Sequence, residues 1–451
     1  MTLTLALVFH IILAIEITFI EVYKRKKGLL FFDFLTIANI FFLLSYSITP
    51  LFYLVFSDKN ILPDILNADY IAALSFFSYH FFLLGWLVAG GLKFQTKKLL
   101  PSYALEFKWF KLGVIFLFIT IFLMILTVVG KGGVVNSLGG ALSRYSFEDV
   151  DSGGFAFLSR LTNVAPFLTS IFFYFLIQKN IGFIGLSKKM IKILFYISLG
   201  LSLFQVFSGA SRGGMLRLFV LLGFIYILVE NKIKLLPTAA IAILIFIFIM
   251  YGKQTFYAVS NLALNNENFS DSFHYLNEVR SNAQSTESDI VFREFSHPYK
   301  SMDTAIRYNS YYSYTYFKDF LWSIFRILPG RFTSIFVERP VPINVINTTL
   351  MTGIPGAGGV PPGLIASFYY SLGVLGALIG CFLYGVLGRC LNVWLFRMMR
   401  AHKIYCVPFA FFSYYFGFFI ANGDPNIYIY YILMPVVFIL SLKIVSARKV
   451  I

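Results

Sequence analysis

The chain has 451 residues, of which 58% are hydrophobic and only 13% are charged, and its mean hydropathy is +0.78. An ordinary soluble domain has about twice this share of charged residues, so the composition excludes a soluble enzyme and a disordered chain. The net charge of +16 would suggest a nucleic-acid partner, but most of the excess lies in short loops between apolar segments, where it indicates membrane orientation instead.

Eleven segments are long and apolar enough to cross a membrane, which takes about 20 mostly apolar residues. In chain order, the predicted spans are 3–22, 30–56, 70–92, 109–129, 159–178, 191–208, 213–230, 235–251, 363–387, 404–421 and 426–446. A basic cluster at positions 24–27 follows the first span, and none precedes it. This order favours a retained span with the N-terminus outside over a cleaved signal peptide.

The charges of the loops support one orientation. The loops 24–29, 93–108, 179–190, 231–234 and 388–403 and the C-terminus, with the adjoining helix ends, hold 22 of the 37 Lys and Arg and four acidic residues. The opposite side has 15 basic and 16 acidic residues, a balance of −1 against +18. Since cytoplasmic loops are enriched in basic residues, we expect the C-terminus in the cytoplasm and the N-terminus outside.

One predicted outer loop, 252–362, has about 110 residues, far more than an ordinary connection. It is polar at first, tyrosine-rich at 308–316, and ends in a Gly/Pro run at 353–363. Long loops on rigid scaffolds often carry function. The tyrosines could stack against sugar rings or form an interfacial aromatic belt. No internal repeat is evident, which weakens a transporter interpretation based on duplicated halves.

The predicted outer side is rich in arginine, with ten among its 15 basic residues, whereas the cytoplasmic loops use mostly lysine. Because arginine presents a rigid fork of donors that suits phosphate, the set suggests a bound phosphate or pyrophosphate. The alternative is contact with lipid headgroups and acidic side chains. Nine of these ten arginines are considered as ligands, namely Arg144, Arg160, Arg212, Arg280, Arg293, Arg307, Arg326, Arg331 and Arg339.

Arg212 stands in the small-residue turn 208–214, between two apolar spans. An arginine between packed membrane helices is costly unless it is paired or lines a polar cavity, so it is a functional candidate, although it could also extend to the interface. The N-terminus of the following helix would add favourable potential for an anion. The Gly/Pro run 353–363 could form an anion-binding nest or a plain turn, and it lacks the Lys and Ser/Thr of a P-loop.

Acid–base candidates lie in the segment 293–298, where Glu294 could act as a general base and His297 as its partner or alternative. A further acid, Asp424, lies in a tight turn between two spans and could equally be a turn former. No HExxH motif and no His/Cys cluster occurs. The three cysteines have no CxxC spacing. The sequence therefore requires no metal and no cofactor.

The chain resembles the Wzy-type O-antigen and enterobacterial common antigen polymerases. The likeness rests on four places that occur in the family's order and, with the span layout, cover most of the chain. They are the turn with Arg212, the segment Pro329-Gly330-Arg331 in the long loop, the Gly/Pro run followed by 364–369 and the glycines Gly373, Gly376 and Gly380, and the late turn Gly423-Asp424.

The resemblance implies an inverting, metal-independent glycosyltransferase of the bacterial inner membrane. It would transfer a growing glycan from undecaprenyl diphosphate to a hydroxyl of an incoming lipid-linked repeat unit on the periplasmic face. Its partners would be lipid-linked oligosaccharides, membrane lipids and a chain-length regulator protein, with no nucleic acid. We expect the pyrophosphate ligands among Arg144, Arg160, Arg212, Arg293, Arg307 and Arg331, and the base among Glu294, His297 and Asp424.

The predicted fold is an all-α polytopic membrane protein with about 11 transmembrane helices and one long extracytoplasmic loop that contains short helices, in a GT-C-like arrangement. It divides into helices one to eight (1–251), the periplasmic loop (252–362) and helices nine to eleven (363–451). Two other functions stay open. An O-antigen ligase would use a similar donor but a different acceptor, and a polysaccharide flippase or other transporter would need polar groups inside the membrane.

Overall fold

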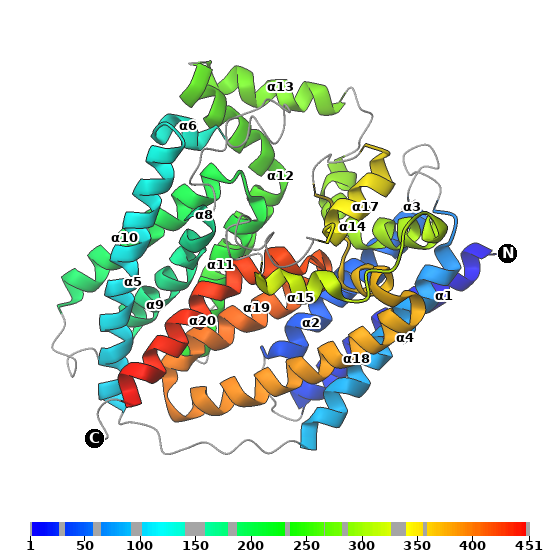
Figure 1. Ribbon diagram of the computed structural model, residues 1–451, viewed down its shortest axis with the longest axis horizontal. Coiled ribbons are helices and arrows are strands. Elements are labelled where there is room, and N and C mark those ends of the chain that lie inside the picture. Colours follow the sequence, from blue (N-terminus) through cyan, green and yellow to red (C-terminus); the bar gives the residue numbers. More distant parts are fainter. Residues whose placement is uncertain are drawn as a thin grey trace. The chain divides into compact units, whose positions relative to one another are not determined.

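The computed structural model describes residues 2–26, 32–56, 65–91, 102–139, 158–178, 187–230, 235–265, 267–281, 287–325, 340–354 and 359–447. Within these ranges every regular element is a helix and no strand occurs, as the composition predicts. Figure 1 gives the positions of the elements along the chain.

Ten helices in the described ranges are long and apolar enough to cross a membrane. They are Leu5–Lys26, Phe34–Val55, Ala68–Gly91, Ala104–Gly130, Leu158–Ile177, Lys188–Ser208, Arg212–Glu230, Leu364–Ala401, Lys403–Asn422 and Pro425–Ile444. They coincide with ten of the eleven predicted spans. The remaining predicted span, 235–251, forms the first part of helix α12 (Leu235–Asn265). The chain is therefore an all-helical, multi-pass membrane protein.

The helices belong to two compact units that are interleaved along the sequence. Unit 1 comprises Met1–Gln95, Thr286–Leu395 and Phe412–Ile429, and unit 2 comprises Thr96–Ser285, Phe396–Phe411 and Tyr430–Ile451. The division into 1–251, 252–362 and 363–451 follows the expected membrane topology rather than packing, and it stays a prediction.

Unit 1 is built from the first three candidate spans and several later elements. It contains α1 (Thr2–Lys26), α2 (Phe34–Leu43), η1 (Leu44–Ile48), α3 (Thr49–Phe56), α4 (Ala68–Val88), η2 (Ala89–Gly91), α14 (Glu287–Arg307), η5 (Asn309–Tyr311), α15 (Lys318–Phe325), α17 (Ile343–Thr352), most of α18 (Leu364–Ala401) and of α19 (Cys406–Asn422). The π-helical turn η1 joins α2 to α3 in one span. Helix α1 packs against α4 (Figure 1).

Two glycines bring the backbones of α4 and α18 together. A Cβ at Gly85 would lie 2.0 Å from the carbonyl oxygen of Phe382, and a Cβ at Gly385 would lie 2.0 Å from that of Phe82. The missing side chains thus permit a reciprocal backbone contact, which is a common way for membrane helices to associate without a hydrophobic driving force.

Helix α18 is interrupted eight residues after it begins. Leu372 (φ −153°, ψ 29°) and Gly373 (φ 61°, ψ −143°) have non-helical backbone angles. A break at membrane depth is tolerated only where other groups satisfy the freed backbone. Here the amides of Thr315 and Tyr316 donate to the carbonyl oxygens of Tyr370 and Ser371, each at 3.0 Å. The segment before α15 therefore closes the break.

Unit 2 contains α5 (Ser102–Gly130), α6 (Val134–Leu138), α8 (Leu158–Leu161), η3 (Thr162–Val164), α9 (Ala165–Ile177), α10 (Lys188–Ser208), α11 (Arg212–Glu230), α12, α13 (Phe269–Ser281), η6 (Lys403–Tyr405) and most of α20 (Pro425–Ala447). Helix α9 packs against α5, α10 and α11. Fully buried Trp109 lies 5.1 Å from the ring of Phe438 and 6.4 Å from that of Phe167, between ring centroids.

Candidate functional site

The turn that carries Arg212 has a strained backbone in unit 2. Helix α10 ends at Ser208, and α11 begins at Arg212. Between them Ala210 is buried and has a φ of 44°, which is unfavourable for a residue with a Cβ. The hydroxyl of Ser211 accepts from the amide of Gly214 at 3.0 Å and so caps α11. The turn thus fixes Arg212, which is half-buried, at the positive end of a helix.

A second arginine, Arg217, lies one and a half turns further along α11, inside the membrane span. Its side chain is buried, and its guanidinium carbon lies 3.8 Å from the ring centroid of Tyr431. A Cβ at Gly214 would come within 3.3 Å of its Nη2. Arg217 is not among the ligands predicted from the sequence, although a single arginine within an apolar span is itself a signal of a functional site.

Arg160 on α8 has the same kind of partner. It is exposed, and its guanidinium carbon lies 4.4 Å from the ring centroid of Tyr430. Tyr430 and Tyr431 are neighbours on α20, so two arginines from different helices meet consecutive tyrosines. Gly252 on α12 leaves room for Arg212, because a Cβ there would lie 2.7 Å from its Cγ. Arg160, Arg212 and Arg217 all belong to unit 2, and we refer to them, with these two tyrosines, as the arginine cluster of unit 2. Their convergence on one ligand stays a prediction.

Of the other predicted phosphate ligands, the structure describes the side chain of Arg307 alone. Arg307, in unit 1, forms an ion pair with Asp303, whose Oδ2 lies 2.5 Å from its Nη2. Asp303 also accepts from the amide nitrogens of Asn67, at 3.2 and 3.1 Å. Arg293 belongs to α14, but its side chain is outside the described part of the structure, as are Arg144 and Arg331 altogether. The convergence of all six arginines on one diphosphate stays a prediction.

The proposed bases Glu294 and His297 both lie on α14. The side chain of Glu294 is outside the described part, and His297 is half-buried and engaged with neighbouring groups. Pro298 follows within the same helix. A direct contact between Glu294 and His297 therefore stays a prediction, and the helix places them three residues apart, on neighbouring positions of one face.

Asp424 lies in a buried polar cluster of unit 1. Its Oδ1 accepts from the backbone amide of Asn426 at 2.8 Å and from Nδ2 of Asn426 at 3.0 Å. The same Nδ2 lies 3.3 Å from both carboxylate oxygens of Asp319 on α15, and Asp319 accepts from the amide of Ile343 on α17 at 3.2 Å. Burial, with a smaller contribution from Asp319, raises the pKa of Asp424, against the hydrogen bonds from Asn426.

Asp319 was not foreseen from the sequence. It lies in an amphipathic segment, and its partner Asn426 is 107 residues away along the chain. Together the two acids and Asn426 connect α15 and α17 of the long predicted loop to the start of α20. The cluster thus combines a structural role with a carboxyl group that holds its proton to a higher pH than usual.

Two of the four places that carry the family likeness meet in unit 1. The amide of Gly363, at the end of the Gly/Pro run, donates to the carbonyl oxygen of Asn422 at 3.0 Å. The hydroxyl of Ser367 donates to the carbonyl oxygen of Gly423 at 2.5 Å. Both glycines have positive φ, 77° and 67°, and a Cβ at Gly423 would lie 2.1 Å from the carbonyl oxygen of Gly363. Glycine is therefore required at this contact.

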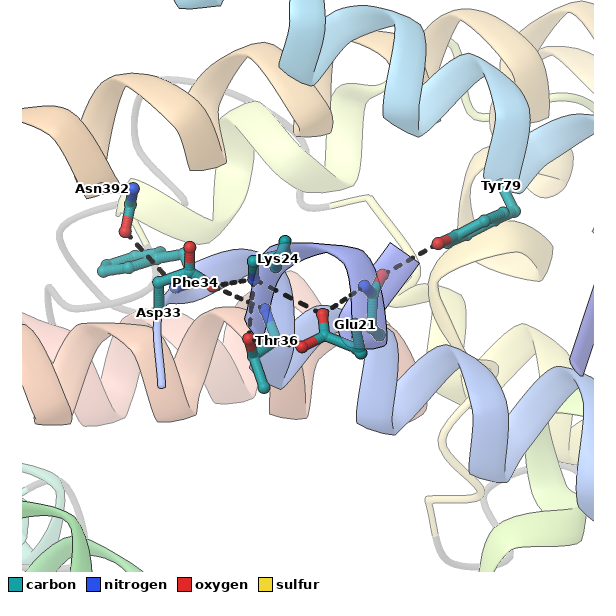
Figure 2. Close-up of polar contacts among 8 residues, drawn as sticks. Glu21, Lys24, Asp33, Phe34, Thr36, Tyr79 and Asn392 are labelled. Atoms are coloured by element: carbon teal, nitrogen blue, oxygen red, sulfur yellow. Dashed lines mark hydrogen bonds and ion pairs between the residues drawn. The ribbon is translucent and has the colours of Figure 1, made fainter. Parts of the chain in front are cut away.

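A second polar network in unit 1 lies at the ends of α1 and α2 that face the predicted cytoplasmic loop (Figure 2). Nζ of Lys24 donates to Asp33 at 2.6 Å, to Thr36 at 2.7 Å and to Glu21 at 3.4 Å. Glu21 also accepts from Thr36 at 2.9 Å and from Asn39 at 2.7 Å. From the sequence Lys24 is expected to be a loop charge, but it is buried and paired.

The network extends further into the membrane span. The hydroxyl of Tyr79 on α4 donates to Asn39 at 3.0 Å. Figure 2 shows Tyr79 at one end of the network. A separate contact joins Glu16 of α1 to His80 of α4 at 3.2 Å. Unit 1 thus holds ionisable groups within helices that are otherwise apolar. Such groups are costly in a membrane unless they are paired or functional.

Comparison with known protein families, with curated proteins and with solved structures finds no match to this chain. Among the described residues, no three His, Cys, Asp or Glu side chains are grouped so that they could hold a metal ion.

Proposed function

We propose that the protein is a membrane glycosyltransferase that polymerises undecaprenyl-diphosphate-linked oligosaccharide repeat units into surface polysaccharide. A hydroxyl of the incoming unit attacks the anomeric carbon of the growing glycan. The new glycosidic C–O bond forms as the bond to the lipid diphosphate breaks, and the diphosphate leaves with the electron pair. A base takes the hydroxyl proton, and the configuration at the anomeric carbon is inverted.

The arginine cluster of unit 2 is the observation that carries this proposal. A leaving diphosphate gains negative charge in the transition state, and fixed guanidinium groups in a poorly solvated site stabilise such charge most effectively. Arg217 is buried and oriented by Tyr431, and Arg212 stands at the N-terminus of α11. Ala210, in the turn between α10 and α11, has a strained backbone. Such strain is often found where a functional site needs a particular geometry.

For the proton acceptor, Asp424 has the support of its environment. Burial raises the pKa of Asp424 in the direction of neutral pH, and a pKa near the working pH favours general acid–base catalysis. Its near-complete burial, at 1% exposure, means that a substrate hydroxyl reaches it only if the turn opens. His297 is half-buried and needs no such opening. We therefore keep Glu294, His297 and Asp424 as candidates, to be separated by Glu294→Gln, His297→Ala and Asp424→Asn.

The test is elongation of purified lipid-linked repeat units by the purified protein. Arg212→Ala and Arg217→Ala should leave short glycans while protein levels and thermal stability stay normal. Arg400→Ala, which removes an arginine stacked 4.4 Å from the ring of Phe396 at the end of α18, is the matched control and should elongate normally. Wild-type chain-length ladders in both cluster variants would contradict the proposal.

The same assay separates the polymerase from a ligase, because a ligase makes no longer product without its separate acceptor. A transporter is the second candidate, and the ionisable groups inside unit 1, Glu16, Glu21 and His80 among them, favour it. Movement of a lipid-linked sugar across reconstituted vesicles without elongation would decide for transport. Activity that persists in the presence of a chelator would support metal-independent transfer.

A further inference from the structure

We propose that the segment Tyr308–Tyr316 is a carbohydrate-binding surface, which we call the tyrosine platform. It consists only of Tyr, Asn, Ser and Thr and lies between α14 and α15 in unit 1. The inference rests on the proposed function, since it gives the glycan substrate a place on the protein. It adds a site that makes no use of the diphosphate or of the arginine cluster.

Two tyrosines anchor the platform. The hydroxyl of Tyr312 donates to the carbonyl oxygen of Ala305 at 3.0 Å, and its ring centroid lies 4.8 Å from that of Tyr370. Tyr314 covers the break of α18, because a Cβ at Gly373 would lie 2.9 Å from its hydroxyl. Both side chains thus face the unit and hold the segment against α14 and α18.

Other tyrosines face outward. Tyr311 is 77% exposed and Tyr316 is 59% exposed. Tyr308 meets Tyr311 edge to face, with ring centroids 5.7 Å apart and planes at 75°, and Tyr314 meets Tyr316 at 6.5 Å and 81°. Among the described residues, the hydroxyls of Tyr308, Tyr311 and Tyr316 have no hydrogen-bond partner. Rings and hydroxyls are therefore both available to a ligand.

The backbone is strained where it turns Tyr316 outward. Tyr316 and Phe317 have φ values of 49° and 58°, and such angles are unfavourable for a residue with a large side chain. The bonds from Thr315 and Tyr316 to the broken helix maintain this conformation. In the described part of the chain, the only other non-glycine residue with positive φ is Ala210, in the arginine turn. Backbone strain thus marks the proposed diphosphate site and this segment alike.

The composition identifies the ligand class. Tyrosine offers a rigid apolar face with a polar end, and Ser and Asn offer adaptable hydrogen bonds, a combination that suits a neutral, polyhydroxylated ligand. The exposed Asn309, Ser310 and Ser313 supply such groups beside Tyr311. The segment has no charged side chain for an anion and no aliphatic side chain for lipid. Phenylalanine, with 54 residues in the chain against 28 tyrosines, is absent from it.

The experiment uses the full-length protein in detergent and the repeat-unit oligosaccharide, released from the cell's own polysaccharide and free of lipid and phosphate. Binding is measured by titration calorimetry. Tyr311→Ala and Tyr316→Ala should each raise the Kd about tenfold, the effect of losing one well-placed aromatic contact. Tyr275→Ala, which removes a tyrosine that is 54% exposed on α13, is the matched control and should bind as wild type.

Tyr316→Gly separates binding from folding. Glycine relieves the positive φ, so this variant should melt at or above the wild-type temperature and still bind the oligosaccharide weakly. Equal binding by wild type, Tyr311→Ala and Tyr316→Ala would overturn the platform, as would a wild type that elongates lipid-linked units but does not bind the free oligosaccharide. A wild type that binds the oligosaccharide but never elongates would instead overturn the polymerase and leave the platform standing.

Discussion

Arg217 and Arg212 differ in what a sequence can reveal about them. Arg212 is recognisable as a functional candidate from the sequence, because it lies in a turn of small residues between two apolar spans. Arg217 lies among Met215, Leu216 and Leu218, and its importance depends on burial and on a tyrosine more than 200 residues later. The sequence alone shows an arginine within an apolar span at position 217, whereas its contact with Tyr431 depends on tertiary packing.

Replacing Arg217 by lysine should impair the proposed reaction although the charge is kept. The planar guanidinium stacks on the ring of Tyr431 and offers a rigid fork of donors. The ammonium group of lysine is a compact point charge without this planar fork. We expect elongation by Arg217→Lys to be about a hundredfold slower, the usual cost of losing one donor to a developing charge. Single-turnover rates with lipid-linked repeat units measure this loss. Arg400→Lys is the control, and equal rates in the two variants would exclude a role for the guanidinium.

Asp424 should make stability depend on pH in a defined direction. Its pKa in the folded protein is raised above 3.8, chiefly by burial, so the folded state keeps the proton to a higher pH than the unfolded chain does. Its contribution to stability is therefore complete below about 3.8 and declines as the pH rises through the folded pKa. Asp424→Asn, which keeps the acceptor for Asn426, should remove this decline.

The measurement for Asp424 is the melting temperature of wild type and Asp424→Asn over a series of pH values. The advantage of the variant should grow as the pH rises from the acidic range towards neutrality. A variant that loses stability relative to wild type over the same range would show that the folded protein prefers the ionised carboxylate, contrary to the expectation from burial.

At the level of the elements, the apolar segments of the sequence predict which helices can cross the membrane. They do not predict how far a helix continues beyond the apolar segment or where it breaks. The span predicted at 363–387 forms α18, which extends to Ala401, because Arg389, Asn392 and Arg397 end the apolar run without interrupting the backbone hydrogen bonds. The break at Gly373 lies inside the apolar run. It depends on the segment around Thr315, which no local pattern connects to α18.

The network at the ends of α1 and α2 should contribute strongly to stability (Figure 2). Removing one partner of a buried ion pair costs about 3–5 kcal/mol, because the charge left behind is neither solvated nor compensated. Lys24→Met would leave Glu21 and Asp33 without their shared cation. We expect a loss of that size in the free energy of unfolding, measured by denaturant titration in detergent micelles.

Lys26→Met is the matched control for Lys24, since it makes the same chemical change two residues further on, at an exposed position of the same helix. It should leave stability nearly unchanged. Equal stability of both variants would mean that water or lipid headgroups reach Lys24 in the folded protein, and that the network is a surface feature.

For the whole molecule, composition was sufficient to predict an all-helical, multi-pass membrane protein. It could not predict the two units, because each is assembled from three separate stretches of chain. Asp319 and Asn426, or Gly363 and Gly423, meet only once that interleaved packing exists. The short motifs on which the family resemblance rests are thus visible in the sequence one at a time, while their contacts are not.

The orientation of the whole chain is the premise on which both proposed sites depend, and it rests so far on the distribution of Lys and Arg. If the excess of basic residues marks the cytoplasm, Ser313, exposed in the tyrosine platform, lies outside. Ser313→Cys should then react with a membrane-impermeant maleimide in intact spheroplasts, and Lys26→Cys should react only after the membrane is opened. Both are made with Cys390 replaced by serine, because Cys381 and Cys406 are already buried. If α12 crosses the membrane, as predicted for 235–251, the reverse labelling pattern would place the arginine turn in the cytoplasm, where no extracytoplasmic polymerase could use it.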